Sequence, residues 1–400
     1  MLKYIDPDTA LNLVLSETKR ARAQSVPLLD ALGRVAAESV FADRDYPPFD
    51  RAMMDGYAVQ VADAGKLVAV VGEVAAGRTP SQSLRPGTCV AIMTGAACPE
   101  GTEAVVEKER IQVQGDTVLL PPNIARDHHV ARRGEEQSKG AVVFERDAEI
   151  TPLAISVLAS VGVRRISVFA PPRLAVITTG QELVFDDAQP GENTIRDSNG
   201  AMLAAQIKLL GLKEPLLLHA EDSLESLATA IEQASKMEIV VFTGGVSMGR
   251  FDLVPQAVSD FGASIVFHKV SQQPGKPLLF AKTDEHLIFG LPGNPLSSYL
   301  CFHRYVSCAI KKMMGKPFSQ RYGRARLARD LVARSDRTLF VNGRVEKHDD
   351  GWLLTPRSRG SSANHFSAID CNAYVRMPPG QHRLEADTEV IFEWTEGYPR

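Results

Sequence analysis

The feature that most constrains the fold is a pattern in which an apolar, strand-like run leads into a glycine-rich turn and then into a helix. It occurs three times, at residues 174–180, 239–247 and 280–295. Glycine lets the backbone approach a ligand closely, and the free N–H groups at a helix start attract negative charge. In a parallel sheet such turns meet at one edge. The repetition therefore predicts a parallel α/β domain whose loops gather around a phosphorylated ligand.

Changes in local pattern divide the 400-residue chain, which is longer than one typical core supports. Residues 7–36 are predicted to form helices, and the prolines after Tyr46 end that pattern because paired prolines cannot continue a helix. Short β-prone runs separated by Gly and Pro continue to about residue 140. A helix from Pro152 to Val161 is then expected to return the chain to the first helical region. The β domain is thus predicted to be an insertion.

Residues 170–315 alternate strand and helix in the manner of βαβ units, and short β-prone runs return after Pro317. The predicted fold class is therefore α/β multidomain. We expect a largely helical linker region at 1–45 and 141–169, an inserted β domain at 46–140, an α/β domain at 170–316 and a C-terminal β domain at 317–400.

Composition argues against several classes of protein. Lys and Arg number 45 and Asp and Glu 48, so the net charge of −3 gives no dominant basic footprint for nucleic acid. No apolar run approaches the roughly 18 residues that cross a bilayer, and the first residues lack the apolar core of a secretory signal. Five cysteines without CxxC spacing offer neither a disulfide framework nor a zinc site, and Cys301 and Cys308 are expected in a core. We expect a reduced, cytoplasmic protein that binds neither nucleic acid nor membrane.

Carboxylates stand beside the glycine-rich turns. Glu182 follows Gly180, and Asp252 follows Gly249. Negative charge at an anion-binding loop is favourable only when a cation lies between the carboxylate and the phosphate, so the pattern predicts Mg²⁺. The alternative is that both acids start helices and are stabilised there by the helix dipole. For Asp197, the alternative to binding a ligand is that it serves as the N-cap of the following helix.

Two further residues suggest chemistry. Lys276 lies between prolines in a stiff loop that would present a fixed cation to an oxyanion, although an isolated lysine is more often a solvated surface charge. Asp55 follows a Pro-Pro turn and precedes Gly56 and Tyr57. The alternative for Asp55 is an ordinary turn-forming Asp-Gly pair.

The motifs that carry a family resemblance run in order from residue 46 to about residue 300. They are PPFD at 47–50, MDGYAV at 54–59, IMTGA at 92–96, RGE at 133–135, TGQEL at 179–183, DSN at 197–199, TGGVS at 243–247 with Gly249 and Asp252, PGKP at 274–277 and GLPGNP at 290–295. Through these motifs the chain resembles the molybdopterin molybdenumtransferases, the last enzymes of molybdenum cofactor synthesis, whose family includes the E domain of gephyrin.

The resemblance implies a central three-layer α/β domain that binds molybdopterin, and a homodimer in which the largely helical region serves dimerisation and the active site lies at the dimer interface. It also implies the reaction. Adenylylated molybdopterin and molybdate are bound together, Mg²⁺ assists cleavage of the phosphoanhydride, and AMP leaves as the metal enters the dithiolene. Other molybdenum cofactor enzymes are candidate partners.

Carried over residue by residue, the resemblance implies catalytic roles for Asp55, Thr94, Glu182, Asp252 and Lys276. Asp55 and Thr94 match the β-domain side of the cleft. It implies Mg²⁺ ligands at Glu182, Asp252 and Asp222, with capping of the next helix as the alternative for Asp222. The residues expected to bind the two substrates are Thr179, Gly180, Asp197, Ser198, Asn199, Gly244, Gly245, Ser247, Gly249, Pro277, Pro292, Gly293, Asn294 and Ser297, of which Pro277 and Ser297 match the molybdate side together with Lys276.

Two departures from the family pattern concern the oxyanion. Gln273 stands where a lysine usually precedes the PGKP motif, and Asn342 stands where an arginine is common. Loss of two cations would weaken attraction for a dianion by about a few kcal/mol in a partly dry site. The pterin and nucleotide side keeps the residues of the family.

Three functions remain open at this stage. The leading one is insertion of molybdate. Adenylyl transfer to molybdopterin is an alternative, because related proteins use the same α/β domain for that step, but those relatives consist essentially of that domain alone. The third is a dimeric scaffold or pterin carrier with weak or altered activity. The departures at Gln273 and Asn342 are the features that favour it.

Overall fold

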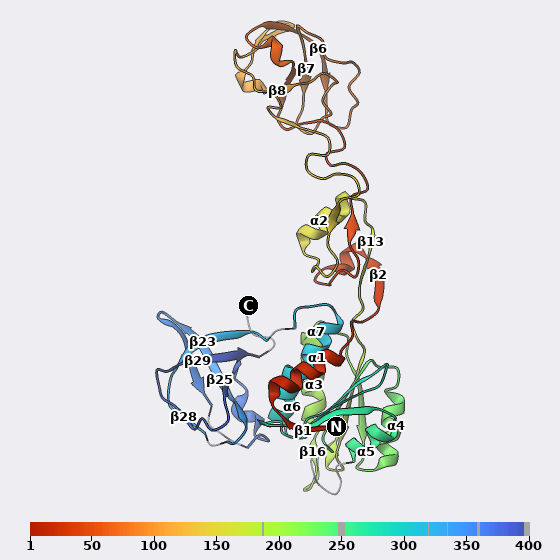
Figure 1. The fold of residues 1–400 in the computed structure, drawn as a ribbon, viewed down its shortest axis with the longest axis vertical. Coiled ribbons are helices and arrows are strands. Elements are labelled where there is room, and N and C mark those ends of the chain that lie inside the picture. The colour runs from red at the N-terminus through yellow and green to blue at the C-terminus, as the bar shows by residue number, and fades with distance from the viewer. Residues whose placement is uncertain (186–187, 247–252, 319, 334, 358–360, 396–400) are drawn as a thin grey trace. The chain divides into compact units, whose positions relative to one another are not determined.

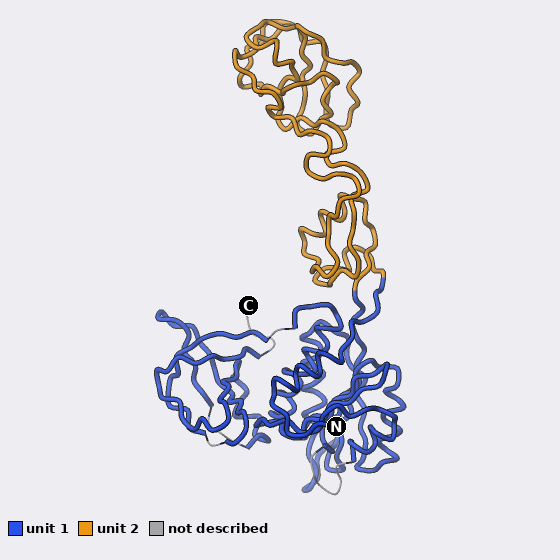
Figure 2. The backbone as a smooth tube through the Cα atoms, in the orientation of Figure 1, with its two compact units in different colours: residues 1–24, 169–400 blue, residues 25–168 orange. Residues whose placement is uncertain are grey.

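The computed structural model describes the chain except for residues 186–187, 247–252, 319, 334, 358–360 and 396–400 (Figure 1). The chain divides into two compact units, residues 1–24 with 169–400 and residues 25–168 (Figure 2). In the described part of the chain, no helix is both long enough and apolar enough to cross a membrane.

The central domain is built on a seven-stranded sheet with the order β1-β19-β21-β22-β18-β14-β17. Its strands are β1 (Leu2–Ile5), β14 (Leu174–Thr179), β17 (Leu216–Ala220), β18 (Ile239–Thr243), β19 (Ser264–Val270), β21 (Leu279–Lys282) and β22 (Leu287–Leu291). β18 pairs in parallel with both β14 and β22, so the three glycine-rich turns leave the same edge. The expected strand at the start of 280–295 is two strands, because the chain reverses at Thr283 and β21 runs antiparallel to β22.

Helices cover both faces of this sheet, which confirms the three-layer α/β expectation (Figure 1). One core lies against α1, α3, α6 and α7, and the other against α4 and α5. Every residue of β14 and β18 is buried, as both faces of a covered parallel sheet require. The helices are α1 (Pro7–Glu17), α3 (Ser198–Leu209), α4 (Leu224–Gln233), α5 (Val254–Asp260), α6 (Pro295–Cys301) and α7 (Ser307–Met313), with a π-helical segment η4 (Phe302–Val306) between α6 and α7.

The prediction of helices throughout residues 7–36 is wrong beyond α1. α1 ends at Glu17, where Thr18 is already extended, and β2 (Ala23–Pro27), which pairs with a later strand, and a 3-10 turn η1 (Leu28–Ala31) follow. The grouping of residues 1–45 with 141–169 also needs correction in its first part. Residues 1–24 belong to the unit that contains the central domain, because β1 pairs with β19 and α1 buries Ala10 and Val14 in the central core.

The unit of residues 25–168 contains the inserted β domain, a six-stranded sheet with the order β8-β5-β7-β6-β10-β9. Its elements are β4 (Arg51–Ala52), β5 (Gly56–Val59), η2 (Val61–Asp63), β6 (Leu67–Val74), β7 (Thr88–Ile92), β8 (Ala104–Glu107), η3 (Lys108–Arg110), β9 (Gln112–Gln114), β10 (Thr117–Leu119) and β11 (Val130–Ala131). β3 (Val40–Phe41) and β12 (Val142–Phe144) flank it in sequence and pair with each other, as the two ends of an insertion should.

The remaining part of this unit packs around α2 (Pro152–Ser160), with β2 paired to β13 (Arg165–Phe169). α2 begins as predicted, because Thr151 caps it by accepting a hydrogen bond from the N–H of Ala154 at 3.2 Å and Pro152 occupies the first turn. Only this short helix and η1 are helical here, so the expectation of a largely helical region is wrong for residues 25–45.

The C-terminal domain is a β barrel. Its strands follow the order β20-β25-β26-β23-β29-β27, and an extra pairing of β25 with β27 closes the ring. The elements of the barrel are β20 (Gln272–Gln273), β23 (Tyr322–Leu327), β24 (Leu331–Val332), β25 (Thr338–His348), β26 (Gly351–Pro356), η5 (His365–Ala368), β27 (Ala373–Met377), β28 (Arg383–Leu384) and β29 (Glu389–Trp394). Two further short strands, β15 (Leu183–Val184) and β16 (Ile195–Arg196), pair with each other in the central domain. β20 comes from the central chain segment and pairs with β25, which ties the barrel to the central domain.

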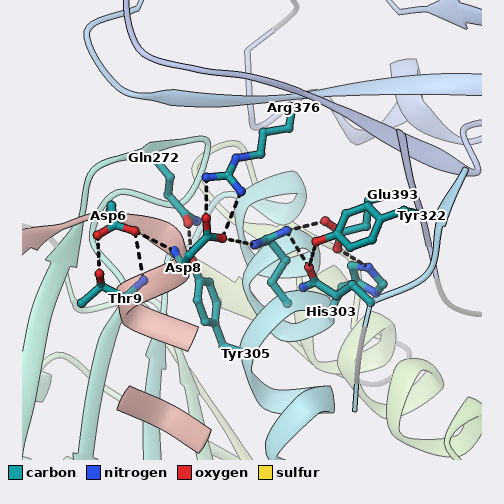
Figure 3. A network of polar contacts seen from close by, with 11 residues as sticks. Asp6, Asp8, Thr9, Gln272, His303, Tyr305, Tyr322, Arg376 and Glu393 are labelled. Carbon is teal, nitrogen blue, oxygen red and sulfur yellow. Dashed lines mark hydrogen bonds and ion pairs between the residues drawn. The ribbon is translucent and has the colours of Figure 1, made fainter. Parts of the chain in front are cut away.

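A buried ion network also joins the barrel to the central domain (Figure 3). Arg304 from η4 forms an ion pair with Glu393 of β29, and the exposed fractions of these side chains are 1% and 4%. His303 Nε2 lies 3.0 Å from the other oxygen of Glu393. Burial alone would lower the pKa of Arg304, but the charge of Glu393 outweighs it and raises that pKa. Asp8 of α1 lies 3.5 Å from Arg304 and 2.8 Å from Arg376, so the network spans both domains.

We expect Glu393→Gln to destabilise the barrel by about 3–5 kcal/mol, because it leaves the buried guanidinium of Arg304 uncompensated. The chain has two tryptophans, Trp352 and Trp394, and both lie in the barrel, so their fluorescence during urea unfolding reports this domain. Glu389→Gln on the same strand is the control, because Glu389 is 61% exposed in its pair with Arg324. That control should cost less than about 1 kcal/mol. Equal unfolding midpoints for the two variants would contradict the role of the buried pair.

Candidate active site

The carboxyl ends of β14, β18 and β22 border a cavity of about 840 Å³. The three glycine-containing turns that the sequence singled out all line it. The lining residues are Thr178, Thr179, Gly180, Glu182, Leu183, Ile195, Arg196, Asp197, Ser198, Asn199, Asp222, Thr243, Gly244, Gly245, Val246, Pro277, Pro292, Gly293, Asn294, Pro295, Ala363, His365 and Phe366. The last three come from the C-terminal domain, so both domains contribute to the wall.

The turn at Gly244 and Gly245 requires glycine for two reasons. Both residues have positive φ angles, 101° and 63°, which L side chains rarely adopt. A Cβ at Gly244 would also lie 2.5 Å from Thr179 Oγ1, and a Cβ at Gly245 would lie 2.9 Å from a methyl carbon of Val254. The turn is therefore packed so closely that its backbone, rather than any side chain, faces the cavity.

Asn199 connects the start of α3 to two of the turns. Its Nδ2 donates hydrogen bonds to Thr243 Oγ1 at 2.9 Å and to the carbonyl oxygen of Gly293 at 2.7 Å. Within the described ranges, Asn199 Oδ1 and Thr179 Oγ1 are buried and make no hydrogen bond. Since buried polar atoms are usually hydrogen-bonded, these two are suited to bind a ligand in the cavity. Ser198 is the first residue of α3 and lies at the same wall.

The acids of the site have different local roles. Asp197 caps α3 by accepting a hydrogen bond from the N–H of Gly200 at 2.9 Å, as its alternative interpretation proposed, and it also lines the cavity. Glu182 does not start a helix, because β15 follows it directly, so the helix-dipole alternative is wrong for this residue. Ser223 rather than Asp222 caps α4. Glu182 and Asp222 both line the cavity.

Three residues predicted for this cavity, Ser247, Gly249 and Asp252, lie outside the described residues. The other predicted residues are divided between this cavity, a second cavity and the inserted β domain.

The second cavity, of about 670 Å³, lies between the central domain and the barrel and shares Pro277, Pro292 and Asn294 with the first. Its lining residues are Gln272, Gln273, Pro274, Gly275, Lys276, Pro277, Pro292, Asn294, Leu296, Ser297, Arg337, Leu339, Phe340, Val341, Asn342, Arg357, Ser361, Ser362, Ser367 and Ala368. The predicted residues Lys276 and Ser297 are thus brought together with both departures, Gln273 and Asn342.

Among the described residues, three cations line this second cavity. Lys276 is exposed, and its Nζ lies 5.4 Å from the centre of the Tyr4 ring. Arg337 donates a hydrogen bond to the carbonyl oxygen of Gln272 at 3.3 Å, and Arg357 is paired with Asp370. As far as the described residues show, Lys276 and Arg337 form no ion pair, so two positive charges remain available to an anion.

Sequence reasoning missed Arg337 and Arg357. No motif marks them, and both come from the barrel, whose strand β25 pairs with β20 of the central chain segment. The pairing places Gln273 opposite Leu339, and Gln273 Oε1 accepts a hydrogen bond from Ser335 Oγ at 3.3 Å. Arg337 lines the same cavity as Gln273, but it is far from Gln273 in the sequence, so the residues around Gln273 could not predict it.

The loop that carries Lys276 is held in place by buried neighbours. Gly275 has φ of 92°, and a Cβ there would lie 2.5 Å from Gln272 Nε2 and 2.6 Å from Cys301 Sγ. Cys301 and Cys308 are buried, which confirms the expectation that they belong to a core. Burial raises the pKa of both thiols, that of Cys308 to about 11, so neither is suited to act as a nucleophile.

Asp55 and Thr94 lie in the other unit, that of residues 25–168. The Thr94 hydroxyl and N–H both donate to Asp55 Oδ1, at 2.7 and 2.8 Å. These hydrogen bonds lower the pKa of the exposed Asp55 carboxyl. Gly56 is required next to it, since a Cβ there would lie 2.0 Å from the carbonyl oxygen of Val106. The carboxylate is thus held in one orientation on the surface of the β domain.

Comparisons with known proteins cover nearly the whole chain. Residues 5–162 match the model of the MoeA N-terminal region (domain I and II), residues 175–312 that of a probable molybdopterin binding domain, and residues 324–393 that of the MoeA C-terminal region (domain IV). A molybdopterin molybdenumtransferase of Bacillus subtilis (strain 168) is 31% identical over 96% of this chain and 93% of its own length. One from Staphylococcus aureus (strain MRSA252) is 30% identical over 97% and 94%.

Solved structures agree with these matches. The crystal structure of a molybdopterin biosynthesis MoeA protein from Pyrococcus horikosii has a TM-score of 0.86 at 30% identity, and the match covers 99% of this chain and 100% of the other. A second such structure, from Pyrococcus horikoshii OT3, has a TM-score of 0.78 at 26% identity over 98% and 100%. Identity over nearly the full length, together with the shared multidomain fold, shows that this chain belongs to the molybdopterin molybdenumtransferase family.

Proposed function

We propose that this protein inserts molybdate into adenylylated molybdopterin and releases AMP. The observation that carries the proposal is the presence of two adjoining cavities of different character at one edge of the central sheet. The first offers glycine turns and acids, which suit a phosphorylated ligand with a bound cation. The second offers side-chain cations, which suit a small oxyanion. Because the cavities share part of their walls, the two substrates would lie next to each other.

In this proposal the first cavity binds the pterin phosphate and the nucleotide. The backbone at Gly244, Gly245 and Gly293 approaches the ligand closely, and the start of α3 points N–H groups into the same wall. Thr179 and Asn199 then complete the hydrogen bonds of their buried oxygens by binding the ligand. Binding this substrate along a fixed backbone would position its phosphoanhydride for cleavage.

The second cavity binds molybdate in this proposal. Lys276 and Arg337 are the two cations there without an acidic partner among the described residues, and together they match the two negative charges of molybdate. The buried Ser297 hydroxyl lies in the same wall and can donate a further hydrogen bond to the oxyanion. Gly275 and its buried neighbours hold the loop, so little conformational freedom is lost on binding.

Mg²⁺ is part of the proposal. Carboxylate oxygens are the ligands that Mg²⁺ prefers, and Glu182 and Asp222 place two of them in the first cavity, with Asp252 proposed as the third. When bound, Mg²⁺ would neutralise the charge that develops as the phosphoanhydride is cleaved. Without it, the two carboxylates would repel the phosphates that the glycine turns attract.

We also propose that the protein acts as a homodimer in the cytoplasm, alongside other molybdenum cofactor enzymes. In the dimer, Asp55 and Thr94 of one copy would face the cavities of the other. The support is that the carboxylate of Asp55 is exposed yet held in one orientation by Thr94, which fits a surface that completes a site elsewhere.

The alternatives are less well supported. Adenylyl transfer to molybdopterin would need the central domain alone, whereas the curated relatives match over at least 96% of this chain. A scaffold or carrier would keep the first cavity but have no use for Lys276 and Arg337 in the second. An assay of AMP release from adenylylated molybdopterin, with and without molybdate, distinguishes the three functions.

Gly245→Asp should abolish binding of adenylylated molybdopterin in a calorimetric titration, because its side chain fits beside Val254 only if the turn shifts, and its negative charge would repel a phosphate at that turn. Gly262→Asp is the matched control. Gly262 also has a positive φ angle, of 91°, but no atom lies within 4 Å of its Cβ position and it is outside the cavity. The control should bind the ligand normally, and circular dichroism should show both variants folded. Unchanged affinity of Gly245→Asp would refute the assignment of this turn.

Glu182→Gln should lower Mg²⁺-dependent AMP release by about tenfold or more, while affinity for adenylylated molybdopterin changes by less than about threefold. The reason is that the lost carboxylate acts mainly on charge that develops in the transition state. Glu214→Gln, at an exposed position outside both cavities, should change neither quantity. Equal losses of turnover and binding would show that Glu182 holds the turn rather than the cation.

Gln273→Lys should lower the molybdate concentration that gives half-maximal AMP release, because it adds a cation to the second cavity. One restored charge in a partly screened cleft contributes about 1 kcal/mol, or about fivefold, and the effect should shrink as salt rises. Gln273→Met controls for loss of the hydrogen bond from Ser335. If half-saturation at low salt is the same in all three proteins, Gln273 does not act on the oxyanion. If none of them turns over, the scaffold function gains support.

A further inference from the structure

A cluster of ligating side chains lies in the inserted β domain, and the proposed reaction does not use it. It consists of Glu107 at the end of β8 and the consecutive residues His128 and His129. One ligand atom from each side chain lies within 4.8 Å of the other two. The side chains are 17%, 32% and 27% exposed, so the cluster is partly buried but open to small solutes.

The three side chains converge on one point. Glu107 Oε1 lies 2.8 Å from His129 Nε2 and 3.4 Å from His128 Nε2. The two imidazole rings lie with their centres 3.9 Å apart and their planes inclined at 45°. Both Nε2 atoms therefore face the same carboxylate oxygen, although successive residues of a strand would point their side chains in opposite directions.

The backbone holds the two histidines in this unusual arrangement. Asp127 and His129 have positive φ angles, 62° and 51°, which are uncommon for residues other than glycine. The turn is fixed on both sides by main-chain hydrogen bonds, from Val105 N to the carbonyl of His128 at 2.9 Å and from Met53 N to the carbonyl of His129 at 2.8 Å. The cluster is thus organised by the fold before any ligand binds.

The polar atoms of the cluster are not satisfied by the protein alone. Within the described part of the chain, His128 Nε2 and Glu107 Oε2 are buried and make no hydrogen bond. The nearest cation to Glu107 Oε2 is the guanidinium of Arg110 at 3.7 Å. Glu107 thus turns Oε1 toward both imidazole rings and keeps Oε2 without a hydrogen-bond donor, so the carboxylate is available as a ligand.

We propose that Glu107, His128 and His129 bind a divalent transition-metal ion of the zinc class, with one coordination position left open to water. Two imidazole nitrogens and one carboxylate oxygen suit Zn²⁺ and its first-row neighbours, whereas Mg²⁺ prefers oxygen ligands alone. The ion would take the neutral Nε2 atoms of both histidines and Oε1 of Glu107 as ligands. The ion replaces the hydrogen bond between His129 and Glu107. A neutral His129 then carries its one proton on Nδ1, whereas a protonated His129 releases its second proton to water.

The site has a consequence for the segment that carries Asp55. Glu107 lies opposite Gly56 in the pairing of β5 with β8, and the N–H of Lys108 donates to the carbonyl oxygen of Asp55 at 3.3 Å. The turn with both histidines also holds Met53 through its main chain. A bound ion would tie these two supports together and restrict the motion of residues 53–56. The ion would thus act as a structural clamp next to Asp55, separate from the Mg²⁺ of the central domain.

The test is a metal titration of the full-length chain prepared without a polyhistidine tag and freed of metal by a chelator. Co²⁺ serves as the probe, because its visible absorption reports coordination by imidazole and carboxylate, and Zn²⁺ is then added to compete. We expect one saturable Co²⁺ site per chain, displacement by Zn²⁺ and no displacement by millimolar Mg²⁺. Glu107→Gln and His128→Ala should each weaken Co²⁺ binding by at least about tenfold. His348→Ala is the control, since His348 is exposed on β25 in the other unit, and it should bind Co²⁺ like the parent chain.

Several outcomes would overturn the proposal. They are the absence of a saturable site, unchanged affinity in Glu107→Gln and His128→Ala, and equal loss in the His348→Ala control. If circular dichroism shows that His128→Ala does not fold, His129→Asn provides the decisive variant. Asparagine accepts the positive φ angle at this position but does not replace the imidazole ligand. A folded His129→Asn protein that binds Co²⁺ with the affinity of the parent chain would also contradict the proposal.

Discussion

The buried charge pair of Arg304 and Glu393 is the interaction on which the rest of the candidate site depends. Removing two charges from water is costly, and only an arrangement that keeps both within hydrogen-bonding distance offsets that cost. The pair therefore favours one placement of the barrel on the central domain. Both cavities need that placement, because His365 of the barrel lines the first and Arg337 of the barrel lines the second. Arg304 also lies over the ring of Phe340, which lines the second cavity, so the charge pair supports the geometry of both binding walls.

The different character of the two cavities follows from the elements that build them. Parallel strands deliver their turns to one edge, and the tight contact of Gly244 with Thr179 leaves main-chain groups as the binding surface. The barrel instead contributes long side chains next to its strands, because Arg337 directly precedes β25 and Arg357 directly follows β26. Backbone N–H groups suit phosphates that are already partly neutralised, and guanidinium groups suit a bare oxyanion. The fold itself therefore separates the two halves of the proposed reaction.

The sequence predicted what depends on neighbouring residues and failed where distant segments meet. The start of α2 at Pro152 and the turn at Gly244 each depend on a few consecutive residues, and both were predicted. The strand β1 was not, because only its pairing with β19, far away in the chain, makes those residues a strand. Arg337 and the cluster of Glu107 with the two histidines were missed for the same reason. Their chemistry appears only when β20 meets β25, or when β8 meets the turn at 127–130.

The same non-local pairing changes the meaning of the departures from the family pattern. Judged from the sequence alone, Gln273 and Asn342 leave the proposed oxyanion site with two fewer cations than the family pattern has. In the folded chain both residues line a cavity that retains Lys276 and Arg337, together with Arg357, which is paired with Asp370. The carbonyl oxygen of Asn342 accepts a hydrogen bond from the N–H of Arg357 at 2.8 Å. Asn342 therefore adjoins a residue that brings its own guanidinium to the cavity. Electrostatic attraction for a dianion depends on the sum of nearby charges rather than on one position. Lys276 and Arg337, which form no ion pair among the described residues, therefore give the cavity proposed for molybdate positive charge without a cation at position 273 or 342, which supports the proposed enzyme over a scaffold.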